Sequence, residues 1–95
     1  MRLDKQERKA LRHSLRNVDG DIFLFGSRLH DDRKGGDIDL LVFSKGSPYR
    51  ISQEIAVNFF KECEEKIDVI VMDNSRLTEQ QQAFVNTLKM EPIVP

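Results

Sequence analysis

The chain has 95 residues, of which 39% are hydrophobic and 33% are charged, a composition typical of a globular protein and sufficient for one domain, residues 1–95. Fifteen Lys and Arg residues against sixteen Asp and Glu give a formal net charge of −1, so we expect no direct binding to nucleic acid or anionic lipid. One cysteine excludes an internal disulfide, and without a signal peptide or an apolar run of about 20 residues we expect a cytoplasmic protein with no membrane contact.

A first helix is predicted over residues 4–17, because Leu11, Leu15 and Val18 recur at helical spacing and Gly20 follows as a terminator. Another side of this helix carries a basic stripe at intervals of three and four residues, formed by Lys5, Lys9, Arg12 and Arg16. A solvated helix face and a binding surface are both consistent with this stripe.

A short apolar run over residues 21–26 predicts a strand buried on both faces, which leads into Gly26-Ser27. One helical turn is expected after Ser27, and Gly35-Gly36 forms a hinge into the next strand, residues 37–43. Because side chains alternate along a strand, Asp37 and Asp39 are expected on the same face.

The second half of the chain predicts a helix from Pro48 to about residue 65, a strand over residues 66–72, a third helix and an edge strand within residues 90–95. Cys63 lies on the apolar side of the second helix, which predicts a core residue rather than a nucleophile. Thr78 and Gln81 form a capping box for the last helix, whose buried side is expected to be Phe84, Val85 and Leu88. This order predicts an α+β fold, a small mixed sheet with helices packed mainly on one face.

Three acids lie in predicted strands, where carboxylates are costly without a partner. Asp37 and Asp39 are roughly 6.6 Å apart along the strand, so they could grip one divalent cation or flank a pair. If the strand that carries Asp68 neighbours theirs, its carboxylate completes a cluster of three. Hard oxygen ligands of this kind favour magnesium or manganese.

The Gly26-Ser27 turn has the features of a phosphate site. Glycine allows close approach of the backbone, amides of a following helical turn can hold an anion, and Ser27 and Arg28 add a hydroxyl and a positive charge. A phosphate turn beside a metal cluster indicates nucleotidyl transfer.

The pattern Gly26-Ser27, nine residues, then Asp37-Ile38-Asp39 resembles the signature of the DNA polymerase beta-like nucleotidyltransferase superfamily, and the size resembles its minimal nucleotidyltransferase (MNT) family. The spacing is one residue shorter than is usual in that family. The resemblance implies that Asp37 and Asp39 bind two catalytic Mg²⁺ ions (or Mn²⁺), that Asp68 binds one and helps to activate the acceptor hydroxyl, and that Gly26, Ser27 and Arg28 hold the nucleoside triphosphate.

The acceptor is expected to come from a partner, because larger superfamily members bind it with extra domains for which 95 residues leave no room. MNT proteins commonly pair with a helical HEPN-family toxin and transfer AMP from ATP to a tyrosine of that toxin. The resemblance therefore implies a hetero-oligomeric antitoxin that is a protein adenylyltransferase. The basic stripe, Tyr49 and Ile93-Val94 are candidate docking surfaces.

Two alternatives remain open at this point. The chain could neutralise its partner by contact alone, although the three intact acids favour catalysis, or it could modify a small molecule such as an aminoglycoside. His13 and His30 have no companion ligands at zinc spacing, and we expect both to be exposed, with His30 close enough to Ser27 to touch a phosphate.

Overall fold

The computed structural model describes residues 2–30 and 36–94, and its elements follow the predicted order. The chain forms α1 (Lys5–Leu15), β1 (Asp21–Phe25), the 3-10 turn η1 (Gly26–Leu29), β2 (Ile38–Phe43), α2 (Pro48–Cys63), β3 (Ile67–Met72), α3 (Glu79–Thr87) and β4 (Met90–Ile93). The predicted α+β class is confirmed.

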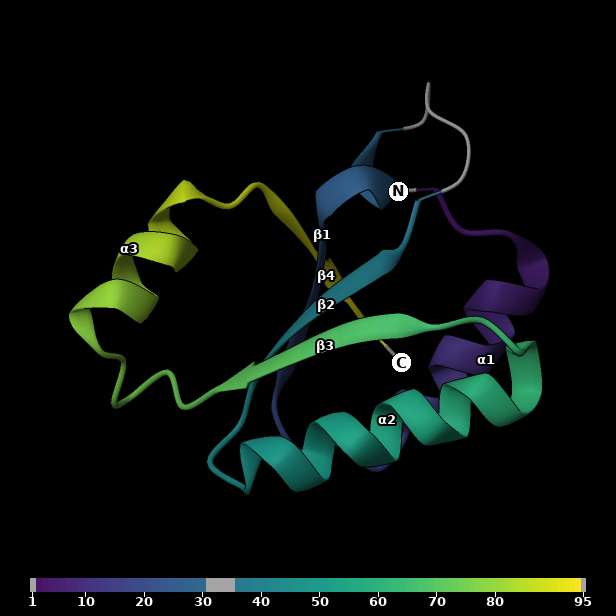
Figure 1. Cartoon of the computed structure of the whole chain (residues 1–95), viewed down its shortest axis with the longest axis horizontal. Coiled ribbons are helices and arrows are strands. Elements are labelled where there is room, and N and C mark those ends of the chain that lie inside the picture. Colours follow the sequence, from purple (N-terminus) through teal and green to yellow (C-terminus); the bar gives the residue numbers. More distant parts are fainter. Residues whose placement is uncertain (1, 31–35, 95) are drawn as a thin grey trace.

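The described strands form one mixed sheet in the order β3-β2-β1-β4 (Figure 1). The strands β2 and β3 are parallel and joined by α2, whereas β1 pairs antiparallel with both β2 and β4. This order makes β3 and β4 the edge strands, and it leaves Pro92 on an edge, where its missing N–H costs no central sheet bond.

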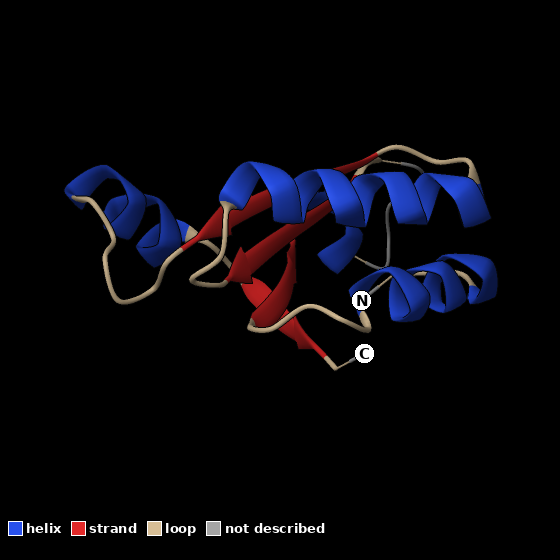
Figure 2. Cartoon of the chain, turned by 90° about the horizontal axis from the view of Figure 1, so that it is seen from below, coloured by secondary structure: helices blue, strands red, loops and turns tan. Residues whose placement is uncertain are grey.

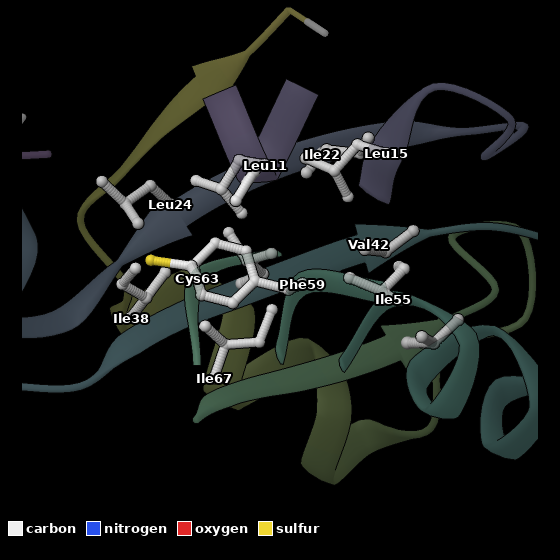
Figure 3. Packing of buried hydrophobic residues seen from close by; sticks show 13 residues of the cluster. Leu11, Leu15, Ile22, Leu24, Ile38, Val42, Ile55, Phe59, Cys63 and Ile67 are labelled. Carbon is white, nitrogen blue, oxygen red and sulfur yellow. The ribbon is translucent and has the colours of Figure 1, made fainter. Parts of the chain in front are cut away.

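Helices α1 and α2 lie side by side, and α3 lies apart from them at the other end of the molecule (Figures 1 and 2). The core forms between α1, α2 and one face of the sheet. Phe59 of α2 is fully buried there, surrounded by side chains of the sheet and of α1 (Figure 3). Cys63 belongs to the same cluster, and burial raises the pKa of its thiol to about 11, which confirms it as a core residue.

Local signals fix the helix starts as the sequence predicted. The Thr78 hydroxyl accepts from the Gln81 amide at 3.1 Å and the Gln81 side chain accepts from the Thr78 amide at 3.0 Å, so the predicted capping box is present. Ser47 caps α2 and Pro48 is its first residue. A second capping box, between Asp4 and Glu7, starts α1.

Several boundaries and burial patterns differ from the prediction. Helix α1 ends at Leu15 rather than residue 17, and α2 ends at Cys63 because Glu64 adopts the left-handed conformation, with a φ of 51°. Burial of β1 on both faces was wrong: Ile22 and Leu24 are buried, but Phe23 and Phe25 on the opposite face are only half-buried.

The buried side expected of the last helix is also a correction. None of the residues of α3, all of which are described, is buried, and Phe84, Val85 and Leu88 are half-buried. The reason is that α3 stands beyond the end of the sheet and reaches it chiefly by an edge-to-face contact of Phe84 with Phe25, with ring centroids 6.1 Å apart. Across the ranges that the structure describes, no helix is both long and apolar enough to cross a bilayer.

Candidate active site

The Gly26-Ser27 turn lies directly on the Asp39 side chain. Strand β1 ends at Phe25, which is paired in register with Asp39, and the chain then turns into η1 with Gly26 at a φ of +79°. A Cβ atom at Gly26 would collide with the carboxylate of Asp39. Only glycine therefore combines this backbone conformation with this close approach. The predicted helical turn is confirmed, but it begins at Gly26, two residues before its expected start after Ser27.

The segment that leads into β2 returns to the same turn. The Ser27 hydroxyl donates to the carbonyl of Asp37 at 3.4 Å, and a Cβ atom at Gly36, where φ is +88°, would collide with the Ser27 side chain. The two ends of the loop are thus packed together at Ser27. Gly35, the other residue of the predicted hinge, lies outside the described residues.

Asp39 and Asp68 lie on neighbouring strands, which meets the condition stated from the sequence, whereas Asp37 precedes the strand in which it was predicted. Asp37 is exposed immediately before β2, and Asp39 is the second residue of that strand. Strand β3 is parallel to β2 and sets Asp68 directly beside Asp39 in the register. Residues paired in this way point to the same face of a sheet, so Asp39 and Asp68 are neighbours there.

The charges of these acids act on one another. The pKa of Asp39 is raised above its ordinary value, first by burial and then by the negative charges of Asp68 and Asp37. Within residues 2–30 and 36–94, no three side chains of His, Cys, Asp or Glu lie close enough to hold an ion together as they stand. The set of carboxylate oxygens nevertheless fits a hard divalent cation, whose charge would remove the repulsion that raises this pKa.

The side chain of Arg28 has partners other than the expected phosphate. Its Nη1 donates to Glu7 Oε1 at 2.8 Å and to the Arg2 carbonyl at 3.1 Å, and its Nε donates to the Gly36 carbonyl at 3.0 Å. The residue is buried, with 8% of its surface exposed. These contacts favour a role in holding the turn over the phosphate contact that the sequence suggested.

Two residues that sequence reasoning missed lie beside the turn. A hollow of about 590 Å³ borders Gly26, Ser27 and His30 on one side and the segment before β4, with Thr87 and Lys89, on the other. Lys89 is exposed and borders the same hollow as Gly26 and Ser27, and its ammonium is a group that binds phosphate. The predicted edge strand was the available signal: Phe25 pairs with Met90, which places Lys89 next to Gly26.

Comparison with known proteins agrees with this geometry. The family model described as "Nucleotidyltransferase domain" matches residues 4–91, which is most of the chain and includes all the candidate site residues. No curated protein matches the sequence. The strand, glycine-serine turn and adjacent carboxylates are therefore found in a chain that belongs to the nucleotidyltransferase domain family, and its chemistry is nucleotidyl transfer.

Proposed function

We propose that this chain is a Mg²⁺-dependent adenylyltransferase that moves AMP from ATP to a tyrosine hydroxyl of a HEPN-family partner and thereby acts as the antitoxin of that partner. The observation that carries the catalytic part is the position of Asp39, which lies against Gly26 of the turn and beside Asp68 of the neighbouring strand. This proximity supports a site in which the proposed phosphate-binding turn and the proposed metal-binding carboxylates act together.

In this proposal the amides of η1 and the Ser27 hydroxyl hold the triphosphate. Asp37, Asp39 and Asp68 would hold the metal ions, which supply charge neutralisation at the phosphates and at the attacking oxygen. The acceptor oxygen attacks the α-phosphorus, the bond from that phosphorus to the β-phosphate oxygen breaks, and pyrophosphate leaves. The Asp68 carboxylate accepts the hydroxyl proton.

The surroundings of Asp68 favour a protein as the acceptor. Asp68 is exposed on an edge strand, and it borders a hollow of about 630 Å³ between α2 and β3. The apolar side chains of Val57 and Phe60 line this hollow and are 47% and 54% exposed. A protein surface that covers these side chains would lie along the edge strand that carries Asp68, whereas a small polar acceptor would gain little from them.

Intact mass spectrometry tests the proposal directly. The chain is incubated with Mg²⁺, each of the four nucleoside triphosphates in turn, and the protein encoded by the adjacent reading frame. We expect one added AMP on that protein with ATP, lost in Asp39→Asn and retained in the matched control Asp21→Asn, an exposed strand acid at the far end of β1.

Two outcomes would overturn the proposal in different ways. If no nucleotide is added and Asp39→Asn neutralises the partner as well as the wild type does, inhibition is by contact alone. If an aminoglycoside or another small hydroxyl compound is modified and the protein is not, the acceptor has been assigned to the wrong class.

A further inference from the structure

A buried ion pair links the N-terminal helix to the phosphate turn. Glu7 and Arg28 are 2% and 8% exposed, and the distance between Glu7 Oε1 and Arg28 Nη1 is 2.8 Å. Burial alone would raise the pKa of Glu7, but hydrogen bonds from Arg28 and the Asp4 amide, with Glu65 nearby, lower it to about 2. Glu7 is therefore ionised in the folded protein, and the pair is a true salt bridge.

Arg28 connects three separate segments through this one side chain. Its guanidinium is bonded to α1 through Glu7, to the N-terminal segment through the Arg2 carbonyl, and to the entrance of β2 through the Gly36 carbonyl. The backbone repeats the same connection, because the Arg2 amide donates to the Arg28 carbonyl at 2.6 Å and Arg2 Nε donates to the His30 carbonyl at 3.1 Å.

The bond to Gly36 bears most directly on the site. The Gly36 carbonyl belongs to the peptide bond that leads into Asp37, while the backbone of Arg28 lies in η1 directly after Gly26-Ser27. One guanidinium thus fixes the distance between the phosphate turn and the first acid. A buried salt bridge contributes little to stability compared with apolar side chains of the same size, so stability alone is a weak reason for this one.

We propose that Glu7 and Arg28 are positioning residues, which hold the Gly26-Ser27 turn and the Gly36-Asp37 peptide at the spacing that a metal-bound nucleoside triphosphate requires. Glu7 orients the guanidinium, and the guanidinium orients both segments. This inference rests on the proposed function for the meaning of that spacing, although the positioning itself can be measured without catalysis.

The test separates charge from geometry. In Arg28→Lys a single ammonium can neutralise Glu7 but cannot also donate to the Gly36 and Arg2 carbonyls in the fixed fork of a guanidinium. We expect Arg28→Lys to retain most of the thermal stability and to lose about 10- to 100-fold in kcat/KM with Mg²⁺ and ATP, chiefly through KM. Full recovery of kcat/KM by lysine would overturn the proposal.

A second variant covers the case in which a lone Glu7 charge prevents folding. Glu7→Gln combined with Arg28→Met leaves no buried charge and keeps a side chain that can accept from the Asp4 amide. In this double variant, we expect hydrogen exchange of the amides in residues 26–30 and 36–39 to be at least about tenfold faster, while amides of β3 are unchanged. Equal exchange in wild type and variant would overturn the proposal.

A control variant and the exchange measurement separate failure of the positioning proposal from failure of the proposed function. Arg50→Met removes another Arg–Glu pair, the exposed one to Glu54 in α2, and should change neither kcat/KM nor exchange at the turn. If the wild type itself transfers no nucleotide, the proposed function fails, and the exchange measurement alone decides whether Glu7 and Arg28 position the two segments.

Discussion

The two faces of the sheet carry different kinds of side chain. The face that α1 and α2 cover carries only apolar side chains on β1 and β2, and Leu24, Leu40 and Val42 there are fully buried. The opposite face has Phe23 and Phe25 half-buried on β1, and Asp39 beside Asp68 at one end. Stability is concentrated on the first face, and the second carries neighbouring negative charges that oppose folding, which is why we propose the ligand site there.

The largest expected effect comes from breaking the covered face. Phe59→Ala removes a fully buried ring and should lower the free energy of unfolding by about 3–5 kcal/mol, measured by urea denaturation. The neighbouring Phe60→Ala is the control, because that side chain is 54% exposed and its loss should cost less than about 0.5 kcal/mol. Similar losses in the two variants would contradict the packing described here.

On the face that α1 and α2 do not cover, the comparison predicts that a substitution raises thermal stability instead of lowering it. Asp39→Asn should lower transfer activity by at least about a hundredfold, because a metal and phosphate site loses its central carboxylate. In metal-free buffer it should raise the melting temperature, since the charge of Asp39 is opposed by burial and by Asp68 and Asp37.

Added Mg²⁺ sharpens that result. It should stabilise the wild type against heat and leave Asp39→Asn nearly unchanged, because a ligand stabilises only the folded state that binds it. The prediction fails if Asp39→Asn melts below the wild type without metal, or if Mg²⁺ raises both melting temperatures equally.

A smaller effect is expected where the turn meets the acid. Gly26→Ala puts a methyl group against the Asp39 carboxylate and forces a φ of +79° on alanine, which costs roughly 1–2 kcal/mol. Because the strain falls on the site, we expect KM for ATP to rise by a larger factor than the loss of unfolding free energy alone would explain. Gly46→Ala is the control, since the nearest atom there is the flexible end of Ile51, and an equal rise in KM would argue against a special role for Gly26.

The sequence predicted the covered face and the strand acids better than it predicted the loop between them. The apolar spacing of α2, the Thr78 cap and the glycine-serine turn are local signals, and each was confirmed by the structure. The position of Asp68 beside Asp39 depended on which strands pair, and sequence could state it only as a condition.

Arg28 shows what local reasoning could not supply. An arginine after a phosphate turn suggests a phosphate contact. The guanidinium of Arg28 instead donates hydrogen bonds to Glu7, Arg2 and Gly36, none of which is a neighbour of Arg28 in the sequence. Nothing in the local sequence singled out Glu7 as the partner of Arg28. The half-burial of Phe25 in β1 was missed for the same reason, since it involves a contact with Phe84 of the distant helix α3.

The smallest expected effect is a pH dependence of stability at Glu7. Its pKa is about 2 in the folded protein against an ordinary value of 4.5, so the ionised form is favoured by folding. Its contribution is complete above about pH 4.5 and is lost as the pH falls toward about 2. Asp4, Glu65 and Arg28 face the same carboxyl, and the pKa of Glu65 is raised, first through its hydrogen bond with Glu7.

Urea denaturation between pH 5 and about pH 2 measures this term. We expect the wild type to lose stability more steeply than Glu7→Gln over that window, and the two curves to run parallel above it, where Glu7 is ionised in both the folded and unfolded states. Parallel curves throughout would mean that Arg28 does not stabilise the charged form of Glu7 in the folded protein. The contact between α1 and the phosphate turn would then depend on packing alone, as the contacts of the covered face do.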